Sequence, residues 1–184
     1  MARRKAQIDF KDLDRTRRIQ VTLLAVVRLV LVLTAGMLLY FLIPVDGFNE
    51  VDPLAAWVRL TVVSLVFLVV LGLQVRIVVA AGVPQVRAVE AVVECVVAFL
   101  LLFALLYLSL STTDPSSFSE RLDRVDALYF TSSTFATVGF GDIVPVTQLT
   151  RVLVAIQMMA GIGVLVMIAK VAFYAAKKGL GQKP

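Results

Sequence analysis

One six-residue run has the residue types and spacing to bind a cation through its backbone. It reads Thr137-Val138-Gly139-Phe140-Gly141-Asp142. The two glycines stand at alternate positions, and glycine takes left-handed backbone dihedrals freely. A strand that alternates between right- and left-handed dihedrals turns its successive carbonyl oxygens to the same side. Such a row of oxygens replaces the hydration shell of a cation and then releases it. The run therefore predicts ion coordination.

The remaining members of the run have separate expected roles. The Thr137 hydroxyl adds an oxygen at the inner end of the row. The side chains of Val138 and Phe140 should point away from the ion and pack behind the strand. Because one strand cannot surround an ion, we expect four copies of the chain around a common axis, in line with the closed symmetry of most homo-oligomers.

The composition indicates a membrane protein. Of the 184 residues, 60% are hydrophobic and only 17% are charged, whereas a soluble domain is nearer half apolar. There is no histidine, which excludes imidazole metal sites, and the lone Cys95 cannot form an intrachain disulfide. The net charge of +5 does not indicate nucleic-acid binding, because the basic residues gather at the chain ends. No acid, base and nucleophile set converges, so we expect neither enzymatic activity nor a cofactor.

Four apolar segments are long enough to cross a bilayer, which takes roughly 20 residues in a helix. They are residues 19–43, 54–81, 86–110 and 148–176. Backbone groups in hydrocarbon must bond within their own segment, so these are helices. The first is too long for the apolar core of a signal peptide, and no cleavage site follows it. The predicted fold is thus all-α and integral to the membrane, with four transmembrane helices per subunit.

The segment 111–147 should hold a fifth, shorter helix that positions the six-residue run. Asp126 is a good N-cap, and about three turns of apolar or small residues follow it. We expect a re-entrant helix over residues 126–136, because this length cannot span the bilayer. Irregular backbone at membrane depth must be buried in protein or line a watery path. The carbonyl end of the short helix, the negative end of its dipole, would face the cation.

The positions of the charges predict the orientation in the cell membrane. Seven basic residues lie in the first 18, and others follow at the second turn and in the last eight residues. The positive-inside rule then places both termini in the cytoplasm and residues 111–147 outside. The basic segment 1–18 is expected to lie on anionic lipid as an interfacial helix, with a disordered tail as the equal alternative.

We divide the chain into four parts: a cytoplasmic segment 1–18, two peripheral helices within 19–83, a pore domain 86–176 and a cytoplasmic tail 177–184. Only about eight residues follow the fourth helix, so we expect no soluble gating domain there. The second helix carries only Arg59 and Arg76, far apart. A voltage sensor needs a ladder of arginines, so weak or no voltage dependence is expected.

Residues 86–176 resemble the prokaryotic potassium channel family, with an outer helix, a pore helix, a filter followed by Ile143-Val144-Pro145, and an inner helix. We call residues 137–142 the filter. The resemblance implies passive potassium conduction by a homotetramer, with potassium sites at Thr137, Val138, Gly139, Phe140 and Gly141 and with Asp142 at the outer mouth. It also implies that Gly161 is the hinge of the inner helix, with close packing at Gly161 and Gly163 as the alternative.

The chain departs from the family pattern at Ser133. Some prokaryotic members carry a glutamate there, behind the filter, which pairs with the aspartate at the mouth. Asp142 should therefore be held differently, and Tyr129 is the candidate partner. A non-selective cation channel and a non-conducting scaffold or regulatory subunit stay open as alternatives. The former usually carries a polar residue in place of Phe140. A potassium transporter would have one filter glycine per repeat, not two.

A group of charged side chains falls at inner-leaflet depth in this topology. A charge at a helix centre costs about 2.5–3.5 kcal/mol on insertion scales, so partners are expected. We hypothesise an ion-pair cluster that ties the first two helices to the pore and biases its gate, with snorkelling to the cytoplasmic surface as the alternative. The residues of the cluster are Arg28, Arg76, Glu90, Glu94 and Lys170.

Overall fold

The computed structural model describes residues 14–42 and 84–179, together with isolated positions 58, 61, 62, 65 and 69. The described residues form four named helices: α1 (Arg15–Leu42), α3 (Pro84–Thr113), α4 (Arg124–Phe135) and α5 (Gln148–Gly179). Three stretches among them are long and apolar enough to cross a membrane, namely Arg15–Leu42, Val86–Thr113 and Gln148–Val171. The predicted all-α membrane fold is confirmed for this part of the chain.

Some of the predicted segments lie outside the described residues. They are the N-terminal segment up to residue 13, nearly all of the predicted second helix at 54–81 and the last five residues, 180–184. Where the helices are described, their bounds differ from the expected ones by a few residues, mostly because the observed helices are longer. Helix α3, for example, runs from Pro84 to Thr113, past the apolar residues 86–110 on which the prediction rested.

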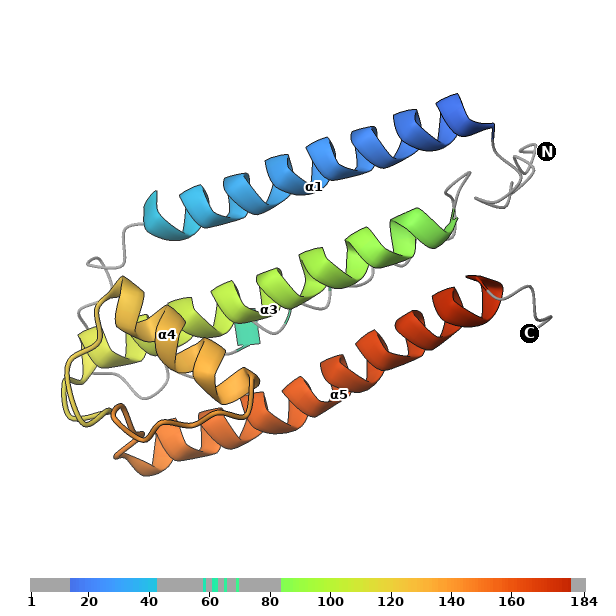
Figure 1. Ribbon diagram of the computed structural model, residues 1–184. Helices are drawn as coiled ribbons and strands as arrows, with labels where there is room; N and C mark the ends of the chain where they lie inside the picture. Colours follow the sequence, from blue (N-terminus) through green and yellow to red (C-terminus); the bar gives the residue numbers. More distant parts are fainter. Residues whose placement is uncertain are drawn as a thin grey trace.

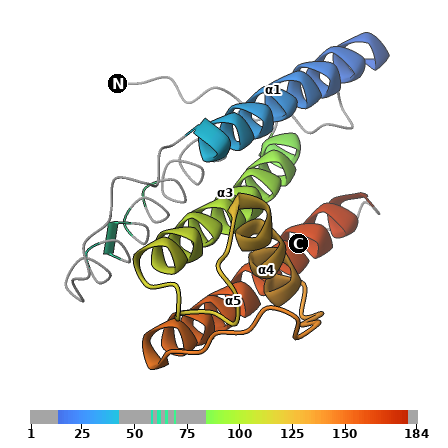
Figure 2. The same ribbon diagram turned by 90° about the vertical axis from the view of Figure 1, so that its left-hand side faces the viewer.

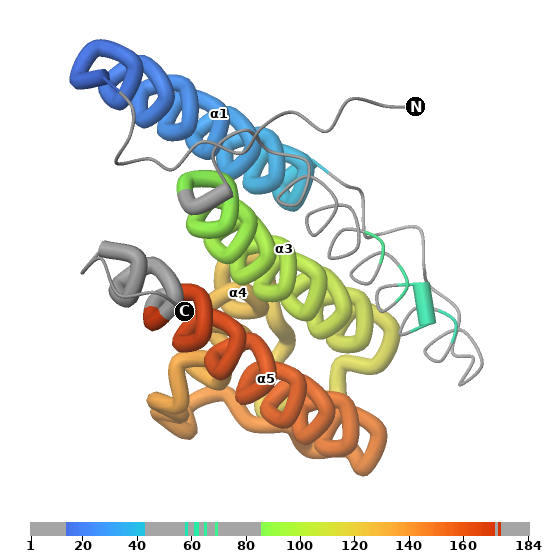
Figure 3. Tube along the Cα trace, turned by 90° about the vertical axis from the view of Figure 1, so that its right-hand side faces the viewer, coloured from blue at the N-terminus to red at the C-terminus, as the bar shows by residue number. Residues whose placement is uncertain are grey.

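The long helices lie side by side, with α3 between α1 and α5 (Figures 1 and 3). Helices α1 and α3 run in the same direction and α5 runs back (Figure 1). The start of α1 and the end of α5 therefore lie at one end of the molecule. The short helix α4 lies at the opposite end, across α3 and α5 (Figures 1 and 2). This arrangement places the filter far from the start of α1.

An aromatic core joins α3, α4 and the loop between them. Tyr107 of α3 packs edge-on against Phe130 of α4, with ring centroids 5.4 Å apart, and against Phe118 of the loop at 5.7 Å. Phe118 and Phe130 complete the triangle at 5.4 Å. Such pairs contribute about 0.5–1.5 kcal/mol each beyond the area that they bury. The core therefore fixes the height and direction of α4 against α3.

The N-terminus of α4 differs from the prediction. The N-cap is Asp123, not Asp126, and the helix covers Arg124–Phe135 instead of residues 126–136. The Asp123 carboxylate accepts hydrogen bonds from the N–H groups of Val125 at 2.7 Å and Asp126 at 2.8 Å. The Asp126 carboxylate accepts one from the Asp123 N–H at 3.0 Å. This reciprocal capping box uses both aspartates, so Asp126 is its third helical residue and not its cap.

The loops on either side of α4 are joined by hydrogen bonds at the end of the molecule where α4 lies. The N–H of Ser119 donates to the Val144 carbonyl, and the N–H of Val146 donates to the Ser117 carbonyl, both at 2.9 Å. The Thr150 hydroxyl, at the start of α5, also donates to the Ser117 carbonyl at 2.9 Å. The segment after the filter is thus tied to the segment before α4, which fixes the far end of the filter loop.

Candidate functional site

The backbone dihedrals of the filter alternate between left-handed and right-handed values, as the spacing of its glycines predicts. The φ angles are +58° at Thr137, +56° at Gly139 and +81° at Gly141, and the residues between them are not positive. A Cβ on either glycine would meet no atom within 4 Å. The glycines are therefore required for their dihedrals and not for lack of space within one chain. The positive φ of Thr137, a β-branched residue, was not predicted and costs about 1–2 kcal/mol.

The end of the filter next to α4 is held through the N–H groups of its first residues. The N–H of Thr137 donates to the Thr134 carbonyl at 3.1 Å, and that of Val138 donates to the Ser133 carbonyl at 2.9 Å. Gly139 shares the Ser133 carbonyl at 3.4 Å. Within the described part of the chain, none of the carbonyl oxygens of residues 137–141 accepts a hydrogen bond. Five consecutive oxygens are therefore available to a cation.

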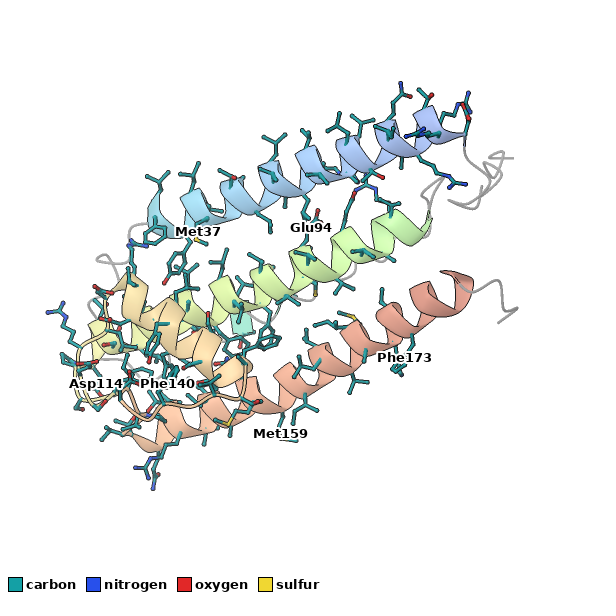
Figure 4. All side chains as sticks on the ribbon, viewed as in Figure 1. Met37, Glu94, Asp114, Phe140, Met159 and Phe173 are labelled. Atoms are coloured by element: carbon teal, nitrogen blue, oxygen red, sulfur yellow. The ribbon has the colours of Figure 1, made fainter. Side chains whose placement is uncertain are left out.

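The side chains of the filter are not covered by their own chain. Val138 is 54% exposed and Phe140 is 69% exposed, so neither is packed behind the strand as expected. The Phe140 ring, labelled in Figure 4, lies parallel to that of Tyr129, with centroids 6.1 Å apart and 9° between the planes. A side chain of this size left open at membrane depth needs another surface to pack against.

The carboxylate at the mouth of the filter is held by a tyrosine. The Tyr129 hydroxyl donates to Asp142 Oδ2 at 2.7 Å, which is the contact favoured by the sequence analysis. This hydrogen bond lowers the pKa of the Asp142 carboxyl, with help from the Ile143 N–H, and it raises the pKa of the Tyr129 hydroxyl. Ser133 contributes differently from a glutamate, because its hydroxyl donates to the Phe130 carbonyl at 3.0 Å and only its carbonyl reaches the filter.

A second support lies between α4 and α5, and the sequence analysis did not identify it. Gln157 of α5 is 1% exposed and its Nε2 donates to the Thr131 carbonyl of α4 at 3.1 Å. Its Oε1 accepts a hydrogen bond from the hydroxyl of Tyr107, which is fully buried in α3. One side chain thus joins three helices. The available signal was a glutamine inside an apolar span, since polar groups at membrane depth seek partners.

Gly161 lies one turn beyond Gln157 and makes the next contact between these helices. A Cβ at Gly161 would lie 3.3 Å from Cδ2 of Phe135, the last residue of α4. Thr131 and Phe135 are four residues apart, as are Gln157 and Gly161, so matching turns of α4 and α5 meet. The structure thus gives Gly161 a close-packing contact, and α5 continues through it without a break. Its role as a hinge stays a prediction.

The comparison with protein families agrees with this arrangement. Residues 95–177 match a family described as ion channel, and they include α4, the filter and most of α3 and α5. The segment is thus similar to members of the ion channel family. The matched residues are therefore called the channel domain below.

Two curated relatives match parts of the chain. A calcium-gated potassium channel of Thermoplasma volcanium is 42% identical over 59 residues, which are 32% of this chain and 17% of the relative. Two-pore potassium channel 4 of Arabidopsis thaliana is 32% identical over 84 residues, which are 42% of this chain and 30% of the relative. The similarity therefore spans less than a third of either relative. No solved structure matches the chain.

Charged residues join α1 to α3 just before the channel domain begins. Arg28 of α1 forms a salt bridge with Glu90 of α3, and Arg87 bonds the same carboxylate oxygen at 3.1 Å. Glu94, one turn further on, is buried and is labelled between α1 and α3 in Figure 4. Of the hypothesised cluster, Lys170 is exposed on α5 and Arg76 lies outside the described residues. Arg87, which was not in the hypothesised cluster, pairs with Glu90 as well.

Proposed function

We propose that this chain is the subunit of a potassium-selective channel that conducts potassium passively across the cell membrane. The observation that carries the proposal is the row of five carbonyl oxygens at residues 137–141, which accept no hydrogen bond in the described structure and follow alternating dihedrals. Rings of backbone carbonyls are the ligands with which channels replace the hydration shell of potassium. The names of both curated relatives describe potassium channels.

The proposed potassium ligands are the filter residues themselves. The carbonyls of Thr137, Val138, Gly139 and Phe140, with that of Gly141 above them, would form the ion sites, and Asp142 would lie at the outer mouth. The Tyr129–Asp142 hydrogen bond and the Ser133 carbonyl would hold the two ends of the row. We expect no other cofactor, because potassium is the permeant ion.

The proposed assembly is a homotetramer around a central pore. Four rows of oxygens would surround an ion, which one row cannot do. The exposed Val138 and Phe140 are side chains that a neighbouring subunit would cover. Met159 and Phe173, which lie on the face of α5 away from α3 in Figure 4, are 76% and 70% exposed. We place this face at the pore and the subunit contact.

The proposed orientation has both termini in the cytoplasm and the filter mouth outside. The basic segment 1–18 and the residues after α5 would lie on the cytoplasmic side, with the former on anionic lipid. The arrangement of the helices supports this, since the start of α1 and the end of α5 lie together and opposite α4 (Figure 1). The Arg28–Glu90 pair would then lie in the inner leaflet, where we propose that it influences the gate.

The test is potassium flux into vesicles that contain the purified protein. We expect barium-sensitive uptake of potassium or rubidium that is clearly faster than the uptake of sodium, as an intact carbonyl filter implies. Gly139→Ala should abolish the uptake, because alanine is strained at the positive φ of this residue. Gly163→Ala is the matched control, since a Cβ there meets no atom within 4 Å and should leave uptake intact.

The outcomes separate the alternatives. Equal sodium and potassium uptake would indicate a non-selective cation channel. A correctly assembled protein without any cation flux would indicate a scaffold or regulatory subunit and would overturn the proposal.

A further inference from the structure

Two reciprocal hydrogen bonds join the outer end of α1 to the start of the pore helix α4. The Tyr40 hydroxyl donates to the carbonyl oxygen of Arg124 at 2.6 Å. The Arg124 guanidinium, through Nη1, donates to the carbonyl oxygen of Tyr40. The partners are 84 residues apart in the sequence. We call this pair of bonds the Tyr40–Arg124 clamp.

Tyr40 is the main anchor of α1 at this end. Only Ala25 and Tyr40 of α1 are classed as buried within the described structure. Tyr40 is 1% exposed, whereas its neighbours Leu39 and Leu42 are 60% and 74% exposed. A helix that is largely exposed in the described structure is thus attached at this end through one buried side chain.

The position of Arg124 is favourable with respect to α1. It is the first residue of α4, where a cation opposes the positive end of the helix dipole. The Tyr40 carbonyl is among the last four of α1, which lack partners within the helix and form the negative end of its dipole. The same guanidinium that is unfavourable for its own helix is therefore favourable for α1.

Helix α4 connects this clamp to the filter. It has twelve residues, and its last carbonyls bind the N–H groups of Thr137, Val138 and Gly139. A displacement of the N-terminus of a short rigid helix is carried to its other end. The filter has few bonds of its own to resist such a displacement, because its middle residues are exposed.

We propose that the Tyr40–Arg124 clamp makes α1 a positioning element for the filter, so that α1 sets how well the filter conducts. This rests on the proposed potassium conduction. The match to the ion channel family begins at residue 95 and does not extend to α1. The clamp gives this additional helix a role in the permeation path without contact with the ion.

The test compares clamp variants of the full chain in planar bilayers. Tyr40→Phe removes one hydroxyl and keeps the ring, and Arg124→Gln removes the charged donor. We expect each to lower the ratio of sustained to peak potassium current by about 2- to 10-fold, the effect of losing one hydrogen bond. Arg124→Lys keeps a charged donor and should restore part of the ratio. The double variant should be little worse than either single variant, because the bonds form one unit.

The control is Arg121→Gln, which makes the same charge change at an exposed position of the loop just before α4. It should leave the current ratio unchanged. Size-exclusion chromatography should show the same assembly for all variants, which separates positioning from folding. Clamp variants that match Arg121→Gln, or that change assembly without changing the current ratio of the assembled protein, would overturn the proposal. If the wild type conducts potassium and the clamp variants keep its current ratio, only the proposed role of the clamp is overturned. If the wild type shows no potassium flux, both proposals are overturned.

Discussion

Replacing Gln157 by leucine should destabilise the channel domain through two buried groups that lose their partner. Leucine has a similar size but cannot bond the Tyr107 hydroxyl or the Thr131 carbonyl, and both of these residues are fully buried. An interhelical hydrogen bond in a membrane protein contributes about 0.6 kcal/mol on average and about 1.7 at most. A buried polar group left without a partner costs about 1–3 kcal/mol. We expect a loss of about 1–3 kcal/mol in the free energy of unfolding.

The measurement is unfolding of the purified protein in mixed micelles by increasing mole fractions of dodecyl sulfate, followed by circular dichroism. Gln20→Leu is the matched control, because it makes the same substitution at an exposed position of α1. It should change the free energy of unfolding by no more than about 0.5 kcal/mol.

Tyr107→Phe should cost less than Gln157→Leu, because it breaks one bond of the two. The double variant should cost less than the sum of the single variants, by about 0.5 kcal/mol or more, since they share a bond. A Gln157→Leu protein as stable as Gln20→Leu, or a strictly additive cycle, would refute the reasoning that this side chain joins the three helices.

Two further variants test the supports of the filter. Gly161→Val should destabilise the domain by about 1–3 kcal/mol, because even a Cβ would lie 3.3 Å from the Phe135 ring; the same unfolding titration measures it, with Gly163→Val as the control. Tyr129→Phe should return the lowered pKa of the Asp142 carboxyl toward 3.8, measured by carbon NMR of labelled aspartate. In the wild type, the stabilisation through Asp142 is present above pH 3.8 and is lost as the pH falls through its lowered pKa. The contribution of Tyr129 is present below pH 10.0 and is lost as the pH rises through its raised pKa. An unchanged carboxyl pKa in Tyr129→Phe would contradict the assignment.

Local sequence signals predicted the elements of the channel domain well. The lengths of the apolar segments predicted helices α1, α3 and α5. The alternate positions of Gly139 and Gly141 predicted their left-handed backbone dihedrals. The predicted N-cap of α4 was wrong by three residues because two aspartates near the start of the helix are both suitable N-cap residues. Asp123 and Asp126 are spaced as a capping box, in which the first is the cap and the second bonds back to it. Reading both as a pair would have placed the helix start correctly.

The contacts that hold the site together were harder to predict, because they join residues far apart in the sequence. Tyr107 and Gln157 are 50 residues apart, and Tyr40 and Arg124 are 84 apart. Tyr40, Tyr107 and Gln157 are single polar residues in apolar segments, and Arg124 is one of several charged residues before α4, so their pairing becomes evident only from the packing of the helices. The Tyr129–Asp142 hydrogen bond could be predicted, because the two residues are only 13 apart in the sequence. In addition, Ser133 replaces the glutamate that would pair with this aspartate in the family pattern.

The distribution of these supports along the filter agrees with the proposed assembly of several chains around one ion path. The end of the filter next to α4 is bound to the last carbonyls of that helix, and Asp142 at the opposite end is bound to Tyr129. Between them, Val138 and Phe140 are exposed and the oxygens of residues 137–141 accept no hydrogen bond in the described structure. Thr137 even holds a strained positive φ in this segment. Carbonyl groups that face one side without a partner cost free energy unless cations bind to them. The exposed side chains on the other side of the strand likewise need protein to pack against. Ion binding and subunit association should therefore be coupled, and potassium should stabilise the assembled protein more than sodium does.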